Sequence, residues 1–287
     1  MRRKGLDRVE SHQSTNNDAA PAANVRAVAD GGTGHAQRVF RVQRAFAELG
    51  GGVHGPGALA RASGLDDSAV HRILQSGVYQ GVFERVGRGR YRLGMSTAYL
   101  GIQALADPPP DGAHSTLEEL RAATGGGLVL LYMLAPFGGA QRQCVDMAVG
   151  DSDLLELGMT PREVLCVTRS LRTGASGRTI LAYLPEPIQR RVLDEPVPPE
   201  AGPGAYRDNA QLIASLADIR DRGYALGHQE CMPAWNSCAA PIMRTDAILG
   251  AVLLLKPATV MPHAPDTVID ATTTAATTLS HLATHTW

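Results

Sequence analysis

The segment Pro56-Gly-Ala-Leu-Ala-Arg-Ala-Ser-Gly64 predicts a short helix that is closed by a tight turn. Proline is favoured at the first position of a helix, and Leu59, Ala60 and Ala62 supply its apolar side chains. Ser63-Gly64 then ends the helix, because glycine adopts the left-handed backbone that a sharp turn requires.

A second helix follows this turn. Asp66 or Asp67 can accept hydrogen bonds from the free amides at its start. Val70, Ile73, Leu74 and Val78 are spaced as its buried stripe, which leaves Ser68, Ala69, His71, Arg72 and Gln75 on or near the outward face. Two helices joined in this way form a helix-turn-helix, whose second helix enters the major groove of DNA. We therefore predict that these five outward residues contact DNA, and a structural ion pair is the alternative role for Arg72.

Two short β-like runs, 82–86 and 91–93, come next, and Gly87-Arg-Gly-Arg90 separates them. Glycine at alternate positions permits a tight hairpin, which places Arg88 and Arg90 at its tip. Residues 38–92 hold nine arginines, no lysine and four acids, a net charge of +5, whereas the whole chain carries −1. Positive charge is therefore concentrated where a phosphate backbone would be met. We predict a wing whose Arg88 and Arg90 contact DNA, whereas Arg85 and Arg92 are as well explained as solvated strand residues.

The composition is that of a cytoplasmic protein of about two domains, since the chain has 287 residues, 44% of them hydrophobic. Its four cysteines form no CxxC pair, which favours reduced thiols. The basic start Met1-Arg-Arg-Lys4 is not followed by an apolar run, and the longest apolar stretches, 128–137 and 248–255, are too short to span a bilayer. No membrane partner is expected.

Composition also predicts the division of the chain. Residues 1–35 are poor in large apolar side chains and are expected to be a disordered tail. A DNA-binding domain covers 36–94, and its first helix carries Val39, Val42, Phe46 and Leu49. A linker helix and loop cover 95–112, in which three consecutive prolines end the helix. Residues 113–287 form the second domain, and residues 93–287 carry a net charge of −7. An acidic surface is a poor match for DNA, so this domain is expected to do something else.

The second domain alternates between helical and strand-like segments. Hairpins are expected over 128–149 and over 237–255, and helices over 114–124, 176–184, 187–193, 209–222 and 267–284. The helix at 209–222 is amphipathic through Leu212, Ile213, Leu216 and Ile219. This order predicts an α+β fold in which helices flank an antiparallel sheet.

Segments in both domains resemble a known family. The first domain resembles the winged helix-turn-helix of the IclR family of transcription regulators in Leu59-Ala-Arg-Ala-Ser-Gly-Leu65, Val70-His-Arg-Ile-Leu74 and Gly89-Arg-Tyr-Arg-Leu-Gly94. The second resembles the effector-binding domain of that family, a GAF-like fold, in residues 174–185, in 219–225 with Glu230 after it, and in Ala239-Ala-Pro-Ile242. The resemblance covers roughly residues 38–285. It implies a homodimer or homotetramer that binds promoter DNA and senses a small organic effector, with no cofactor.

The effector site is expected between facing strands and the Gly174 loop, whose amides precede a helix and suit a carboxylate. The candidate residues are Tyr132, Arg172, Thr173, Ala175, Ser176, Glu230, Trp235, Ser237, Cys238, Leu253 and Leu255. Simple capping of the helix is the alternative for the loop, and a place in the core is the alternative for Trp235. Spacing of His228, Cys231 and Cys238 matches no common zinc motif, so no metal is expected.

Five positions differ from what the family commonly has. Asp66-Asp67 stands where proline and lysine are common, Arg172 stands where histidine is frequent, and Leu253 and Leu255 replace small hydroxyl residues. The resemblance then implies a ligand with an apolar body and one anionic or strongly polar end, and Arg172 would orient that end. The alternative is a pocket that the leucines fill.

Enzyme motifs are lacking in the sequence: it has no GxSxG, Walker or HExxH pattern, and no GxGxxG that follows a strand. We therefore expect a regulator whose effector shifts its affinity for promoter DNA. The alternative is an enzyme or interaction module with a GAF-like domain and a vestigial DNA-binding domain.

Overall fold

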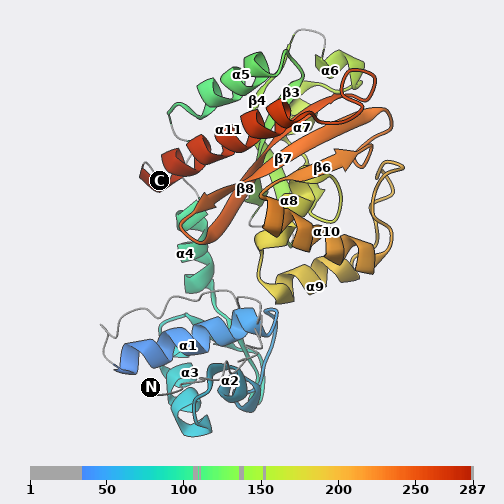
Figure 1. Ribbon diagram of the computed structural model, residues 1–287. Coiled ribbons are helices and arrows are strands. Elements are labelled where there is room, and N and C mark those ends of the chain that lie inside the picture. The colour runs from blue at the N-terminus through green and yellow to red at the C-terminus, as the bar shows by residue number, and fades with distance from the viewer. Residues whose placement is uncertain (1–33, 106–108, 110, 136–138, 151–152, 286–287) are drawn as a thin grey trace, which may run out of the picture.

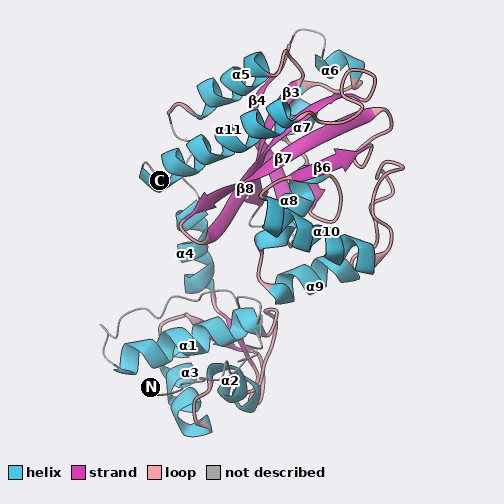
Figure 2. Ribbon diagram, in the orientation of Figure 1, coloured by secondary structure: helices cyan, strands magenta, loops and turns pink. Residues whose placement is uncertain are grey.

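The computed structural model describes residues 34–105, 109, 111–135, 139–150 and 153–285, and α4 (Met95–Leu105) joins its two domains (Figure 1). The tail predicted for residues 1–35 therefore lies almost wholly outside the described residues. The N-terminal domain is mainly helical, and the C-terminal domain holds a sheet with helices on both faces (Figure 2). The predicted α+β class is confirmed.

Three helices and a hairpin form the N-terminal domain. They are α1 (Gly34–Glu48), α2 (Pro56–Ser63), α3 (Asp67–Tyr79), β1 (Phe83–Arg85) and β2 (Tyr91–Leu93). Gly64 closes α2 with a φ of 62°, in the left-handed region that the sequence predicts. Val42 and Phe46 of α1 pack against Leu74 and Phe83, and the two phenylalanine rings stack with centroids 5.4 Å apart. Each such buried side chain stabilises the domain by about 1.5–3 kcal/mol.

The buried face of α3 is rotated relative to the face that the sequence predicts. Val70, Ile73 and Leu74 are buried as expected, but Val78 is 37% exposed and Ala69 is only 4% exposed. The cause is Gly77, where an added Cβ would lie 2.2 Å from the Phe83 ring. The Phe83 ring packs against the backbone at Gly77, and the buried face of α3 therefore includes Ala69. Placing Ala69 on the outward face and Val78 in the core was therefore wrong. Leu49, placed in the first helix, follows the end of α1 and is 37% exposed.

Helix α4 leaves the wing and leads to the C-terminal domain. Its first turn packs closely beside the start of the wing, since the Ser96 amide donates to the Gly81 carbonyl over 3.2 Å and the Thr97 hydroxyl donates to the Val82 carbonyl over 3.1 Å. Three of its large apolar side chains are open to solvent: Met95, Tyr99 and Leu100 are 58%, 60% and 64% exposed. Apolar side chains gathered on one exposed helix are typical of an interaction surface.

Six antiparallel strands form the sheet of the C-terminal domain, in the order β5-β4-β3-β8-β7-β6. They are β3 (Leu128–Ala135), β4 (Gln141–Ala148), β5 (Thr168–Ser170), β6 (Ala225–His228), β7 (Trp235–Arg244) and β8 (Ala247–Pro257). Helices α5 (Ala113–Ala123) and α11 (Asp266–His285) pack on one face, and α8 (Ala175–Tyr183) and α10 (Asn209–Arg222) pack on the other. Both predicted hairpins are confirmed.

The sequence did not predict the edge strands β5 and β6 or the short helices α6 (Asp153–Glu156) and α7 (Pro161–Leu165). These elements have three to five residues each and are too short to show a periodic pattern. Ile213, predicted on the apolar face of α10, is 51% exposed.

Helix α9 (Glu186–Asp194) meets the N-terminal domain. Arg191 donates a hydrogen bond from Nη1 to the Gly50 carbonyl over 3.2 Å. A Cβ on Gly50 would lie 3.5 Å from the Cβ of Pro187. Gly50, Gly51 and Gly52 have φ values of 82°, 73° and 85°, which only glycine adopts without strain. The turn after α1 and the start of α9 therefore form a direct contact between the two domains.

Candidate DNA interface and effector site

Asp66 caps the recognition helix α3. Its Oδ1 accepts hydrogen bonds from the Ala69 amide over 2.7 Å and from the Ser68 hydroxyl over 2.6 Å. The hydroxyl of Ser68 and the amide of Ala69 hold the pKa of Asp66 below its ordinary value. Of the two aspartates that the sequence left open as the cap, the structure uses Asp66, and Asp67 lies in the first turn.

Four of the five residues predicted to read DNA lie on the exposed side of α3: Ser68, His71, Arg72 and Gln75. Gln75 and His71 contact each other through their Nε2 atoms, which are 3.2 Å apart. The side chains of one helix face can enter a major groove together, so these four remain candidates for base contact. Ala69 is buried and is not a surface residue.

The arginines of the wing have different local partners. Arg92 forms a double hydrogen bond with Glu84 across the hairpin, with both distances at 2.9 Å, and Arg85 donates to the Gly87 carbonyl over 3.2 Å. Arg90 donates to the Val53 carbonyl over 3.1 Å. Arg88 is exposed at the tip, between two glycines with positive φ. The geometry leaves Arg88 the best placed of these arginines for contact with phosphate.

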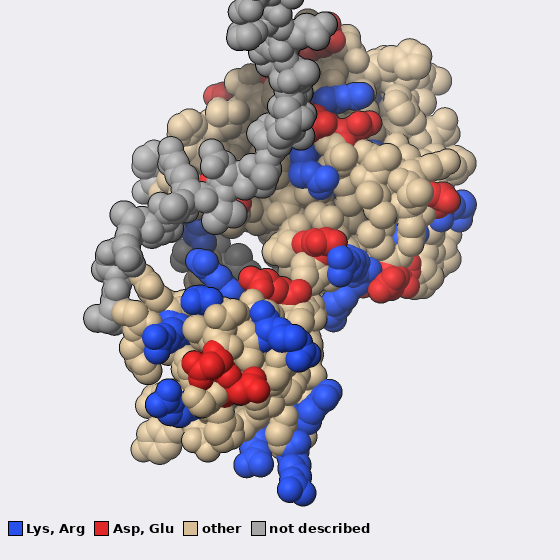
Figure 3. Space-filling model, turned by 60° about the horizontal axis from the view of Figure 1, so that its bottom comes forward, with Lys and Arg blue, Asp and Glu red and all other residues tan. Residues whose placement is uncertain are grey.

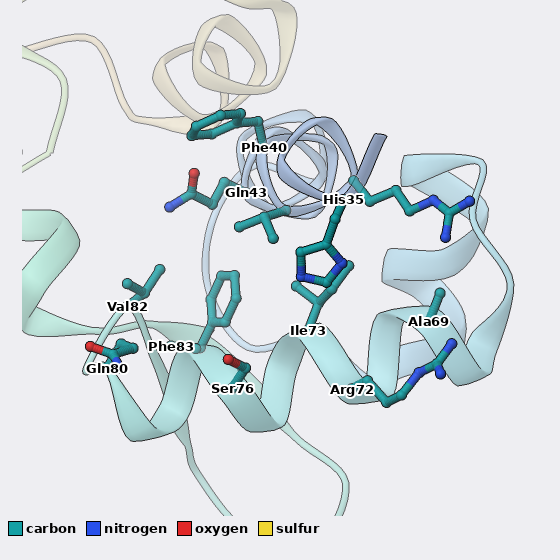
Figure 4. A pocket seen from close by; sticks show the side chains of 13 residues that line it. His35, Phe40, Gln43, Ala69, Arg72, Ile73, Ser76, Gln80, Val82 and Phe83 are labelled. Carbon is teal, nitrogen blue, oxygen red and sulfur yellow. The ribbon is translucent and has the colours of Figure 1, made fainter. Parts of the chain in front are cut away.

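Arginines surround a pair of neighbouring acids on the face of the N-terminal domain that Figure 3 presents. Beside α3 this domain also has a hollow of about 470 Å³, bounded by α1, α3 and the start of β1 (Figure 4). Its wall combines apolar groups such as Val39, Ile73 and Phe83 with Arg38 and Arg72. The hollow therefore adjoins the face predicted to read DNA.

In the C-terminal domain the Gly174 loop is already occupied by a carboxylate. Glu230 accepts hydrogen bonds from the Gly174 amide over 3.0 Å and from Nε of Arg178 over 2.9 Å, and it also pairs with Nη2 of Arg178. Both charged side chains are only 3% exposed. Glu230 was predicted to contact an effector, but its oxygens complete a buried ion pair that fixes the start of α8.

Arg142 of β4 is a buried cation that the sequence analysis missed. Its guanidinium lies 5.2 Å from the centre of the Tyr132 ring and donates to the Ser170 carbonyl. Gly174 and Gly177 make room for it, since a Cβ on Gly177 would lie 2.4 Å from its Nη1. Its Nε has no hydrogen-bond partner among the described residues. A charged residue on the inward face of an alternating strand was the available signal.

Arg172, predicted to bind the effector, holds helices together instead. It donates to the Leu193 carbonyl over 3.0 Å and to the Asn209 side chain over 2.6 Å, so it joins the end of α9 to the start of α10. Its side chain is 4% exposed. These contacts engage two of its nitrogens, and its Nε has no hydrogen-bond partner among the described residues, so a role for Arg172 beside the Gly174 loop stays a prediction.

The remaining effector candidates are divided between the two faces of the sheet. Tyr132, Ala175, Leu253 and Leu255 belong to the apolar cluster under α8, and Trp235 packs against it. Ser237 also faces α8: a Cβ on Gly227 would touch both Ser237 and Ala175. Thr173 and Ser176 are buried in or beside the loop. Cys238 belongs to the opposite cluster under α11, so its assignment to the same site was wrong. Strand alternation separates it from Ser237.

Burial suppresses the ionisation of two groups near this loop, Tyr132 and Cys231. It raises the pKa of Tyr132 to about 12 and raises the pKa of the Cys231 thiol. The Cys231 sulfur would lie 2.3 Å from a Cβ on Gly174, so it packs directly on the loop. The loop thus contacts the Cys231 thiol and Arg142 in addition to the Glu230 carboxylate.

Two further observations bear on function. Within the described ranges, no three His, Cys, Asp or Glu side chains gather in a way that could hold a metal ion. No helix in that part of the chain combines the length and apolar character needed to cross a bilayer.

Comparison with known proteins identifies both domains. Residues 36–86 match the model of the IclR helix-turn-helix domain, and residues 167–281 match that of the bacterial transcriptional regulator IclR C-terminal region. A Halobacterium salinarum protein, described as Probable HTH-type transcriptional regulator ArcR, is 27% identical over 207 residues, which are 70% of this chain and 74% of that protein.

Solved structures share the fold. An IclR homologue from Microbacterium hydrocarbonoxydans, complexed with 4-hydroxybenzoate, aligns with a TM-score of 0.53 at 21% identity, over 86% of this chain and 98% of its own. The Thermotoga maritima IclR aligns with a TM-score of 0.51 at 21% identity, over 86% and 97%. With a capped recognition helix and wing in one domain and a matching regulatory fold in the other, the chain belongs to the IclR family of transcriptional regulators, with a helix-turn-helix DNA-binding domain and a C-terminal effector-binding domain.

Proposed function

We propose that this protein binds promoter DNA as a homodimer or homotetramer, and that a small organic anion in its C-terminal domain changes its affinity for that DNA. The observation that carries the proposal is the exposed face of α3 beside an arginine-bearing wing. We place this activity in the cytoplasm, as the sequence predicts, within the domain boundaries at residues 36–94, 95–112 and 113–287.

The DNA contacts are assigned by exposure. Ser68, His71, Arg72 and Gln75 face outward from α3 and are proposed to meet base edges. Arg88 is proposed to meet phosphate, and Arg90 is proposed to do so when it leaves the Val53 carbonyl.

Self-association is proposed through α4. Its exposed Met95, Tyr99 and Leu100 offer apolar area that a second copy would bury. One winged domain contacts few base pairs, so two copies on one DNA site would supply the affinity and half-site spacing that specific binding needs.

The effector is proposed to be a monoanion with an apolar body. Leu253, Leu255 and Tyr132 supply an apolar surface, and Arg142 supplies a buried cation whose Nε is unpartnered within the described residues. The 4-hydroxybenzoate bound to the Microbacterium hydrocarbonoxydans homologue belongs to this class. The effector would act by binding one arrangement of the domains better than another, which changes DNA affinity by the same coupling free energy.

We propose no catalytic activity. Ser176, the only hydroxyl of the Gly-Ala-Ser-Gly turn, is fully buried, and its Oγ has no hydrogen-bond partner in the described part of the chain. A nucleophilic serine requires an adjacent base.

Footprinting on the DNA upstream of the gene, with and without aromatic monocarboxylates, tests the proposal. We expect protection that weakens with salt and that changes when the effector is added. Binding that does not depend on salt, or turnover of an acyl substrate, would favour an enzyme or interaction module with a vestigial DNA-binding domain.

A further inference from the structure

A second cavity lies near the domain contact and apart from the Gly174 loop. It has a volume of about 290 Å³ and lies between the end of β3, the start of β4 and one side of α9. Its apolar lining comes from Leu134, Leu184, Ile188 and Val192. This volume is close to the lower end of ligand sites, about 300 Å³, and suits a molecule with a single ring.

Two charged side chains complete the wall of this cavity, Arg191 and Glu195. Both are exposed, so an ion can reach them from solvent. The guanidinium would pair with one carboxylate of a ligand whose ring lies on the apolar wall. The nearby acid would repel a second anionic group. The lining therefore fits an aromatic monocarboxylate better than a dicarboxylate.

Arg191 also forms the contact between the domains. Its Nη1 donates to the Gly50 carbonyl over 3.2 Å and would lie 3.7 Å from a Cβ on Gly51. This is a bond from an exposed side chain to a neutral acceptor. The positive charge of the guanidinium already strengthens this bond, but a carboxylate adds the opposite charge and can accept two parallel N–H bonds from the same guanidinium, so it is the stronger acceptor. A ligand carboxylate at the cavity would therefore draw the guanidinium away from Gly50.

The segment that Arg191 holds leads directly to the wing. His54 exchanges two backbone hydrogen bonds with Tyr91 of β2, over 2.8 and 2.9 Å, and its ring contacts the Gly51 carbonyl at 2.5 Å. The carbonyl of Val53, the residue before His54, accepts the bond from Arg90. Residues 50–54 thus join α9 at one end to a predicted DNA contact at the other.

We propose that this cavity is an effector site for an aromatic monocarboxylate, and that the ligand competes with the Gly50 carbonyl for Arg191 and so releases the wing from α9. The proposal rests on the proposed function, because it requires DNA binding that a ligand controls. It differs from the sheet-face site in its residues and in its direct link to the wing.

Full-length protein tests the proposal, with benzoate, phthalate and benzyl alcohol as probes. Calorimetry measures probe binding, and fluorescence anisotropy measures binding to a duplex from the upstream region. Arg191→Gln removes the shared cation. Arg190→Gln is the matched control, because the neighbouring Arg190 pairs with Glu186 and does not line the cavity. Ile188→Phe fills the cavity and leaves Arg191 in place.

Benzoate should bind the wild type and Arg190→Gln better than phthalate or benzyl alcohol does. Arg191→Gln should weaken benzoate binding by about tenfold or more, the effect of one charged hydrogen bond. Without ligand, Arg191→Gln should change DNA affinity by about fivefold or more, in the direction that benzoate changes the wild type. Ile188→Phe should lose the benzoate binding that depends on Arg191 and keep the ligand-free DNA affinity of the wild type.

The inference is overturned, with the proposed function intact, if Arg191→Gln behaves like Arg190→Gln or if benzoate does not bind a wild type that binds DNA. Benzoate binding that Arg142→Gln abolishes and Ile188→Phe leaves unchanged also overturns it and assigns the ligand to the sheet face. Absence of salt-dependent DNA binding by the wild type is the separate result that refutes the proposed function.

Discussion

Replacing Glu230 by alanine should destabilise the C-terminal domain far more than replacing a surface carboxylate. Glu230 and Arg178 are both 3% exposed, and the carboxylate also accepts the Gly174 amide. The change leaves a guanidinium and an amide buried without their acceptor. Breaking a buried pair from one side costs about 3–5 kcal/mol. A domain of this size loses about 2–4 °C per kcal/mol, so the melting temperature should fall by roughly 10 °C.

The assay is urea and thermal unfolding at one fixed protein concentration, because self-association would otherwise shift the midpoint. Glu84→Ala is the matched control. Its partner Arg92 is half exposed, and a pair of that kind contributes about 0.2–1 kcal/mol. The double variant Arg178→Met with Glu230→Leu should recover most of the lost stability, since it removes both charges. Equal destabilisation by Glu84→Ala and Glu230→Ala would refute the reasoning.

Three further outcomes are expected. Arg72→Ala should cost about 1–3 kcal/mol of specific DNA binding and relax preference at one position per half-site, whereas Arg88→Ala should weaken all sequences alike and lower the salt slope by about one. Equal operator affinities and salt slopes for these two variants in anisotropy titrations would contradict the assignment. Sedimentation should show a dimer or tetramer at micromolar concentration that Tyr99→Glu dissociates, and a wild-type monomer that binds operator tightly would rule out assembly through α4. A hydrogen bond and charge attraction from Asp146 raise the pKa of His114 above its ordinary 6.5, so the stability from this contact is present below about pH 6.5 and is lost as pH rises through the raised pKa. His114→Gln should remove this pH dependence from the urea midpoints. A pH profile that the substitution leaves unchanged would contradict the role of His114.

The helix-turn-helix could be predicted because its signals are local. Gly64 marks the turn, Asp66 marks the cap, and Val70, Ile73 and Leu74 mark the stripe, all within one short segment. The position of the stripe could not be predicted to the residue. It depends on Phe83, which comes from β1 and packs on Gly77 of α3. Contacts between distant segments override the apolar pattern of a single helix.

The effector domain was predicted as a fold but only in part as a site. Long apolar strands indicated β3 and β8, yet no pattern told which arginine would stay near the loop. Arg172 lies two residues before Gly174 in sequence but reaches α9 and α10, whereas Arg142 reaches the loop from β4. The face of Cys238 followed from alternation with Ser237 and could have been predicted. Only the fold shows that the Arg142 side chain reaches the loop and that the Arg172 side chain contacts α9 and α10.

The acidic start of α3 bears on how the protein finds its site. A helix N-terminus normally offers free amides and a positive dipole end to any phosphate it meets. Here Asp66 occupies the amide of Ala69, and Asp67 adds a second negative charge in the first turn. Among the described residues of this domain, attraction to DNA of arbitrary sequence then depends on the arginines. Such a protein leaves non-target DNA sooner, so fewer copies per cell suffice to occupy one operator among many competing sites.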